Sequence, residues 1–411
     1  MLNTVSSALV WFFAALTFAL SITVPNGYNI GTSLIFLFSL IFLLKPKWRE
    51  LNKEDKLLFW GFALYAVAMF GFVYLDGWHT RELDRPSRFI LVLPVLLLLL
   101  KSAGRERWLW FGTVLGAIAA FSLAIYERKV LGYGRAHGSE HPIMFGNTGM
   151  LLGLLSFVSA TYFLANKRYI WLALAVVGGL CGIAASVLSA SRGGWVALPL
   201  IGFFLLWQSR FLLGKKLVWS VCIASVLLVG AAVALPQSGI KDRIEEAISD
   251  VEHYSDGSNK TTSVGLRFEM WKASLSMFEE SPLVGVGEYG SKAVKERLVA
   301  DSAISQDVIH FSHSHNEYIN ALGLTGIVGF IFLMSVYLIP LRLFLKKMRQ
   351  YPNNWNIRSY AMAGALVPMC YMDFGLSQVM FSHNIGVMMY VFPIVYFWAA
   401  VRWAERKEFA K

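Results

Sequence analysis

Long uncharged blocks of apolar residues recur along this 411-residue chain and restrict its fold more than any other feature. Residues 57–75 and 217–235 contain no charged residue, and residues 89–100 are almost entirely aliphatic. A helix of about 20 apolar residues is needed to cross the hydrocarbon core of a bilayer. Because lipid offers no hydrogen-bond partners to the backbone, each block must form a helix that pairs its own peptide groups. We therefore expect an all-α polytopic membrane protein.

The apolar blocks predict about twelve transmembrane helices and one large polar loop. We expect residues 1–235 to hold nine spans, residues 236–314 to form the loop, and residues 315–411 to hold three more spans and a tail, all within a single integrated membrane domain. No basic residue and no clear cleavage site accompany the first block, so we expect it to be retained. The expected spans are residues 7–24, 29–44, 57–75, 88–100, 108–126, 148–165, 170–188, 195–207, 217–235, 316–341, 359–381 and 384–401.

The basic residues predict how the chain is oriented. One alternate set of short connections, which includes the C-terminal tail, holds 22 Lys and Arg residues, whereas the opposite set holds 7. Because basic residues accumulate on the cytoplasmic side, both termini are expected there and the polar loop is expected on the outer side. The net charge of +11 is then a topology signal, and no nucleic-acid partner is expected. The three cysteines lie within expected spans, so neither a disulfide framework nor a zinc site is expected.

The polar loop is expected to contain amphipathic helices. Ile240, Ile244, Ile248 and Val251 recur at helical spacing opposite acidic residues, which is typical of a helix lying on a membrane surface or on the bundle. A second helix is expected over residues 263–278 and should end before Ser281-Pro282.

The sequence His313-Ser314-His315-Asn316-Glu317 marks the start of the tenth expected span. If the helix includes His315, then Gly326 and Gly329 fall near the same face, where small residues let a neighbouring helix approach closely. A histidine can exchange a proton near neutral pH, which suits a general base. The alternative interpretation is an ordinary pair of solvated histidines at a helix start.

Arginines provide the other candidate sites, all on the expected outer side. Arg192 stands beside Gly193-Gly194 in a tight turn, where a guanidinium and exposed backbone N–H groups could hold a phosphate. An interfacial arginine that reaches lipid headgroups is the alternative. Two further signals are weaker. Arg267, with Trp271 one helical turn later, also fits an ordinary amphipathic helix. The stretch from Arg135 to Asn147 has no clean metal-ligand spacing.

At these residues the chain resembles the O-antigen ligase family, within the superfamily that includes O-antigen polymerases and pilin oligosaccharyltransferases. The most specific motif is His-Asn, nine residues, then Gly-x-x-Gly. The matching pieces are His315-Asn316 with Gly326-Ile327-Val328-Gly329, the turn Ser189 to Trp195, Arg267 with Trp271, Pro282 to Gly287, and the stretch before the sixth expected span.

The resemblance implies a multi-pass enzyme of the bacterial inner membrane with a periplasmic active site. Such ligases resemble lipid-donor, GT-C-like membrane glycosyltransferases: they move O-antigen from undecaprenyl diphosphate to lipid A–core oligosaccharide, with inversion and without metal or other cofactor. Lipid partners are therefore expected. His315 is expected to be the base, and Arg192 and Arg267 are expected to hold the diphosphate. Lesser candidates for substrate contacts are His313, Asn316, Arg88, Arg85, Arg81, Arg135 and Trp271.

Two alternatives stay open at this point. An O-antigen polymerase or a protein O-oligosaccharyltransferase would share the site and differ in acceptor. A polytopic lipid transporter would translocate lipid without covalent transfer, although proton-coupled transporters usually bury more charge at mid-membrane.

Overall fold

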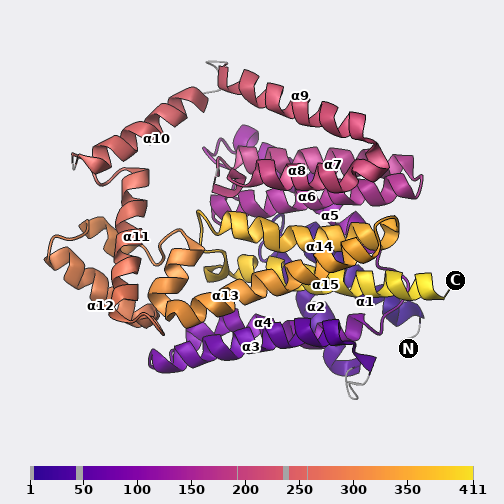
Figure 1. Ribbon diagram of the computed structural model, residues 1–411, viewed down its shortest axis with the longest axis horizontal. Helices are drawn as coiled ribbons and strands as arrows, with labels where there is room; N and C mark the ends of the chain where they lie inside the picture. Colours follow the sequence, from indigo (N-terminus) through magenta and orange to yellow (C-terminus); the bar gives the residue numbers. More distant parts are fainter. Residues whose placement is uncertain (1–3, 43–49, 192, 235–239, 257, 411) are drawn as a thin grey trace. The chain divides into compact units, whose positions relative to one another are not determined.

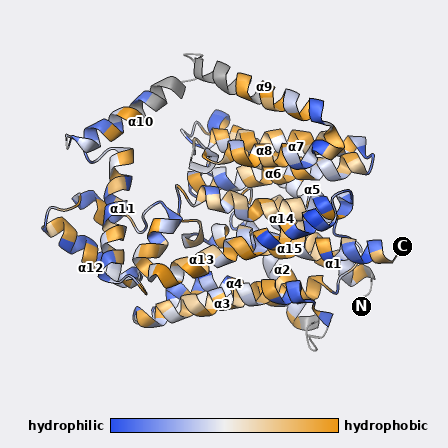
Figure 2. Cartoon of the chain, viewed as in Figure 1, coloured by the Kyte–Doolittle hydropathy of each residue, from blue (hydrophilic) through white to orange (hydrophobic). Residues whose placement is uncertain are grey.

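The structure is a computed structural model that describes residues 4–42, 50–191, 193–234, 240–256 and 258–410, and most of them are helical (Figure 1). No strand occurs among these residues. Seven of the described helices are long and apolar enough to cross a membrane. Their apolar side chains dominate along most of their length (Figure 2). The expected all-α polytopic membrane fold is confirmed.

Each expected span coincides with an α-helix. The agreement arises because an uncharged block in lipid can hardly adopt any other structure. The twelve helices are α1 (Thr4–Leu20), α2 (Gly27–Phe42), α3 (Lys53–Leu75), α4 (Asp84–Leu99), α5 (Trp108–Ile125), α6 (Pro142–Ala165), α7 (Tyr169–Leu188), α8 (Leu198–Leu213), α9 (Lys215–Ala234), α13 (Glu317–Gln350), α14 (Trp355–Phe374) and α15 (Asn384–Phe409).

The chain divides into two compact units. One comprises residues 1–71, 79–201 and 332–411, and the other comprises residues 72–78 and 202–331. The proposed division at residues 235 and 314 stays a prediction.

Small residues let the helices of the first unit pack closely. A Cβ placed on Gly182 of α7 would lie 2.4 Å from the Cα of Gly153 on α6, so neither glycine has room for a side chain. Close approach of this kind drives association of helices in lipid, where burial of apolar surface contributes little. The α6–α7 pair is therefore held by backbone proximity.

A buried network of charges joins three helix ends of the first unit. Asp55 at the start of α3 accepts hydrogen bonds from Trp398 Nε1 (2.8 Å) and Arg402 Nε (3.1 Å) of α15. Lys347 of α13 donates to Glu405 of α15 at 2.7 Å, and Arg402 pairs with the same carboxylate. Charges in a helical bundle persist where they are paired in this way. The sequence pattern predicted only basic loops here, not this network.

The second unit contains the polar loop. Helix α10 (Ile240–Ser255) confirms the expected amphipathic helix, and Ile248 and Val251 are exposed on it. Helix α11 (Ser263–Glu280) confirms the second expected helix. Thr262 caps its start, because the Thr262 hydroxyl accepts a hydrogen bond from Gly265 N at 3.0 Å. Helix α12 (Gly287–Ala300) was not predicted, because its apolar residues are few.

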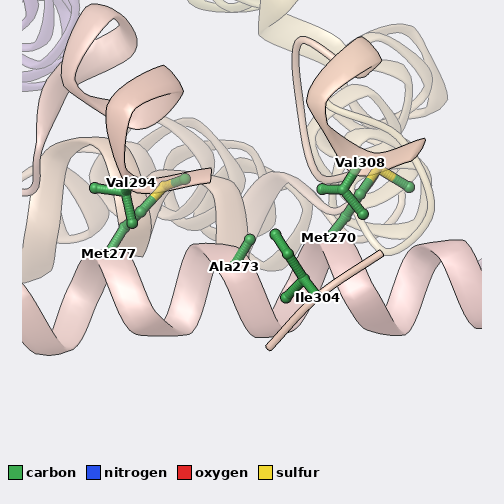
Figure 3. Close-up of a cluster of buried hydrophobic side chains, with 6 residues drawn as sticks. All are labelled: Met270, Ala273, Met277, Val294, Ile304 and Val308. Atoms are coloured by element: carbon green, nitrogen blue, oxygen red, sulfur yellow. The ribbon is translucent and has the colours of Figure 1, made fainter. Parts of the chain in front are cut away.

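A small hydrophobic core holds α11 and α12 together. One face of α11 contributes Met270, Ala273 and Met277 to the cluster, and Val294 of α12 lies beside Met277 (Figure 3). Ile304 and Val308, from the segment that follows α12, complete the cluster. Burial of a large apolar side chain contributes about 1.5–3 kcal/mol. This core therefore supports the segment that leads to His313 and His315.

Candidate active site

His315 lies in a tight turn just before α13. Its φ is +50°, a left-handed conformation that is uncommon for a residue with a Cβ. Helix α13 begins at Glu317, and Asn316 caps it, because Asn316 Oδ1 accepts hydrogen bonds from the backbone N–H groups of Tyr318 and Ile319, both at 3.0 Å. The expectation that His315 belongs to the helix is wrong, because the helix begins only after the capping residue Asn316.

Neighbouring residues hold this turn from two sides. Trp271 Nε1 of α11 donates to the carbonyl of Ser314 at 3.0 Å. On the other side, Ser314 N donates to Asn320 Oδ1 of α13 at 3.2 Å, and Ser314 is buried. A strained backbone conformation persists only where its surroundings over-determine it. Trp271 therefore fixes the backbone beside His315.

The two histidine rings contact each other. Their centroids are 4.5 Å apart with an interplanar angle of 73°, so one edge meets the face of the other. His315 N also approaches Nδ1 of His313 at 3.4 Å. On α12, Lys295 Nζ donates to the carbonyl of Phe311 at 2.9 Å, two residues before His313. The site therefore contains two imidazoles in contact, on a segment tied to both α11 and α12.

Arg267 lies one helical turn before Trp271 on α11, about 6 Å along the helix axis. It is half-buried, and within the described part of the chain no carboxylate lies within 4.0 Å of its guanidinium. Desolvation lowers the pKa of Arg267. A cation that is partly removed from water without a protein counter-ion gains most from an anionic ligand. This environment fits the expected phosphate contact.

The Gly-x-x-Gly motif breaks α13 and joins it to the Pro282–Gly287 segment. Gly326 has φ 62° and ψ −166°, which interrupts the helix. The freed N–H groups of Ile327 and Val328 donate to the carbonyls of Pro282 (2.8 Å) and Leu283 (3.2 Å). A Cβ on Gly326 would lie 2.4 Å from the Leu283 carbonyl carbon, so only glycine fits.

A second close approach completes this junction. Val286 N donates to the carbonyl of Gly323 at 3.1 Å, and a Cβ on Gly285 would lie 2.2 Å from the carbonyl carbon of Leu324. Gly326 and Gly285, one from each motif, therefore serve a backbone-to-backbone junction. The expectation that Gly326 and Gly329 lie on one continuous helical face with His315 is wrong. Helix α13 begins after His315 and is broken at Gly326.

In the other unit, the turn expected around Arg192 is present, but Arg192 itself lies outside the described residues. Ala190 has φ +52°. A Cβ on Gly193 would lie 1.9 Å from Ser377 Oγ, so this glycine is required by space. Asp373 of α14 accepts a hydrogen bond from Ala197 N at 2.7 Å and so fixes the residues after the turn.

Arg135 lies against the same turn. Its Nε donates to the carbonyl of Ser189 at 2.9 Å. Glu127, which the sequence did not single out, is buried and accepts hydrogen bonds from the backbone N–H groups of His137 (2.8 Å) and Gly138 (2.9 Å). Desolvation, Arg135 and His137 together lower the pKa of His141. The stretch after Arg135 is thus folded around Glu127 as a polar loop.

The three arginines around the start of α4 differ in their surroundings: Arg81 precedes the helix, whereas Arg85 and Arg88 belong to its first turns. Arg85 pairs with Glu82 at 2.7 Å, and Arg88 pairs with Asp84 at 2.9 Å while it donates to the Asn384 carbonyl at 3.0 Å. Arg81 is exposed. Of the three, Arg81 is the most accessible to a ligand, whereas Arg88 serves to join α4 to the start of α15. No group of three potential metal ligands occurs among the described residues.

Comparisons with known proteins bear on the resemblance to this family. Residues 177–334 match the family described as O-antigen ligase. An uncharacterised protein of Haemophilus influenzae is 27% identical over 379 residues, which cover 92% of this chain and 94% of that protein. An O-antigen ligase of Escherichia coli K12 is 25% identical over 213 residues, which cover 51% of this chain and 48% of the ligase. The resemblance found in the motifs is confirmed.

Proposed function

For a chain that carries an O-antigen ligase domain, we propose that it transfers O-antigen polysaccharide from undecaprenyl diphosphate to lipid A–core oligosaccharide. The reaction takes place at the periplasmic face of the inner membrane, and both termini are cytoplasmic. The observation that carries the proposal is the turn at His315, whose strained backbone is fixed by Trp271, from the helix that also bears the half-buried Arg267.

His315 acts as the general base in this proposal. The acceptor hydroxyl gives its proton to the imidazole as its oxygen forms a bond to the anomeric carbon of the donor sugar. The bond from that carbon to the diphosphate oxygen breaks at the same time, and undecaprenyl diphosphate leaves. Attack opposite to the leaving group inverts the anomeric carbon. His313 and Asn316 support the base from either side.

Arg267 and Arg192 stabilise the leaving diphosphate. Negative charge develops there as the glycosidic bond breaks, and fixed cations in a partly dehydrated site stabilise it. The proposed reaction needs no metal, because the arginines supply this charge. Arg81, Arg85, Arg88 and Arg135 are proposed to contact phosphates of the donor or of the core oligosaccharide, with Arg81 the most accessible of them.

A purified transfer assay tests the proposal. The protein is mixed with undecaprenyl-diphosphate glycan and purified lipid A–core in the presence of EDTA, and ligated product is measured. We expect His315→Ala to abolish product, while His310→Ala, at an exposed position five residues earlier, leaves it unchanged. Wild-type product from His315→Ala would remove His315 as the base, and loss of product with EDTA would contradict metal independence.

The acceptor distinguishes this function from its nearest alternatives. An O-antigen polymerase would use a second lipid-linked glycan as acceptor, and a protein O-oligosaccharyltransferase would use a polypeptide. Each acceptor is offered separately in the same assay. A transporter, by contrast, would give no covalent product with any acceptor, although it would move labelled lipid across a vesicle membrane.

A further inference from the structure

Lys295 of α12 lies behind the histidine pair. It is half-buried, and its Nζ donates to the Phe311 carbonyl at 2.9 Å. Lys295 and His313 line one small cavity, whose other polar lining comes from Ser274, Ser291, Ser312 and Asn320 together with Ser314. A partly buried ammonium on the wall of the same cavity as an imidazole disfavours the protonated form of that imidazole.

The charges that surround the histidine pair come from several elements. Arg267 belongs to α11, Lys295 and Glu288 belong to α12, Glu317 begins α13, and His310 precedes the pair on its own segment. Among the residues that line the cavity, Lys295 is the cation and none carries a carboxylate. Lys295 therefore stands out as the cation that shares a cavity with His313. Desolvation lowers the pKa of its amine, and the Glu288 carboxylate opposes this effect in part.

Two effects act on the histidine pair in the same direction. His313 and His315 contact each other with ring centroids 4.5 Å apart, so protonation of one disfavours protonation of the other. The Lys295 ammonium, on the wall of the same cavity as His313, disfavours a further positive charge on the pair. A general base must be unprotonated before it accepts a proton.

We propose that Lys295 is a positioning residue that fixes the segment before the histidines through Phe311 and keeps the His313–His315 pair unprotonated at neutral pH. This inference rests on the proposed function, because it assigns the pair to general base catalysis. Lys295 does not contact the reacting atoms; it acts through the segment and through its charge.

The pH dependence of transfer tests this role. Three variants are compared with the wild type: Lys295→Met removes the charge, Lys295→Arg keeps it, and Lys292→Met removes a well-exposed lysine of the same helix. We expect the acid limb of the rate profile to move upward by about one pH unit in Lys295→Met, and to stay in place in the two controls. A rate that falls equally at every pH in Lys295→Met would overturn the electrostatic role.

A second measurement does not depend on transfer. Diethyl pyrocarbonate modifies unprotonated imidazoles, and tandem mass spectrometry of the peptide separates His313 and His315 from His310. The pH of half-maximal modification of the pair should rise in Lys295→Met. An unchanged value would sink the inference, even if transfer is impaired. A third outcome is that the pH of half-maximal modification rises in Lys295→Met while neither the wild type nor any variant forms ligated product. In that case the proposed function fails and the role of Lys295 in controlling the pair stands.

Discussion

The indole nitrogen of Trp271 donates a hydrogen bond to the carbonyl of Ser314 at 3.0 Å and thereby joins α11 to the residue before His315. The residues are 43 positions apart in the chain. This bond links the helix that bears Arg267 to the turn that presents the imidazole. The Arg-Trp pair, a weak signal in the sequence, and the His-Asn pair of the most specific motif therefore meet through one contact.

Replacement of Trp271 by phenylalanine keeps the ring against Phe268 but removes the donor. A lost hydrogen bond costs about 1 kcal/mol, which corresponds to roughly a fivefold lower rate if the cost falls on the reactive geometry. We expect Trp271→Phe to lower the rate of transfer by about that factor, with little change in thermal stability in detergent. A variant with the wild-type rate would show that the turn does not need this bond.

Arg267 should act on the donor rather than on the acceptor. Its guanidinium can hold two phosphate oxygens at once, which an ammonium cannot. We expect Arg267→Lys to retain part of the transfer rate and Arg267→Gln to reduce it about 100-fold or more, with the largest effect on the dependence of rate on lipid diphosphate concentration.

Arg297 of α12 offers the matched control, because it pairs with Glu280 on the outside of the same unit. Arg297→Gln should leave the donor dependence unchanged. If Arg267→Gln behaves like this control, Arg267 has no place in the diphosphate site.

Glu127 gives a prediction about the first unit. Its buried carboxylate accepts hydrogen bonds from the backbone of His137 and Gly138, and thus folds the loop that carries Arg135. Glu127→Gln keeps the shape but replaces one oxygen by a donor that opposes these N–H groups. Since a buried unsatisfied group costs about 1–3 kcal/mol, we expect a lower melting temperature and weaker transfer. Glu140→Gln, in the same loop, serves as the comparison and should have the smaller effect on melting.

The sequence predicted the helices far better than the site. Lipid leaves an uncharged block such as residues 57–75 almost no alternative to a helix. The conformation of His315, in contrast, depends on a cap at Asn316 and on a partner from another helix, Trp271. Glu127 could not be recognised because its partners are backbone groups that only the tertiary fold brings to it. The spacing of apolar residues predicts which face of a helix is buried. It does not predict the residue at which a cap begins or ends the helix.

The glycine junction provides the most direct test of the motif. A methyl group on Gly326 would lie 2.4 Å from the Leu283 carbonyl carbon, and one on Gly285 would lie 2.2 Å from that of Leu324. Both glycines also have positive φ, which alanine adopts at a cost of about 1 kcal/mol or more. We expect Gly326→Ala and Gly285→Ala each to lower the melting temperature and to reduce transfer strongly, because the backbones must separate and the start of α13 must move.

Gly290 of α12 shows whether these losses come from the junction. A Cβ there would be 3.5 Å from Val286 Cβ, an ordinary contact, and the residue is helical. Alanine at this position should be neutral or stabilise the protein by about 0.5–1 kcal/mol. If Gly326→Ala melts like Gly290→Ala and transfers glycan at the wild-type rate, the broken helix is not required and the motif needs another explanation. If both junction variants melt early while Gly290→Ala does not, the Gly-x-x-Gly motif serves to join α13 to the Pro282–Gly287 segment and so to support the turn at His315.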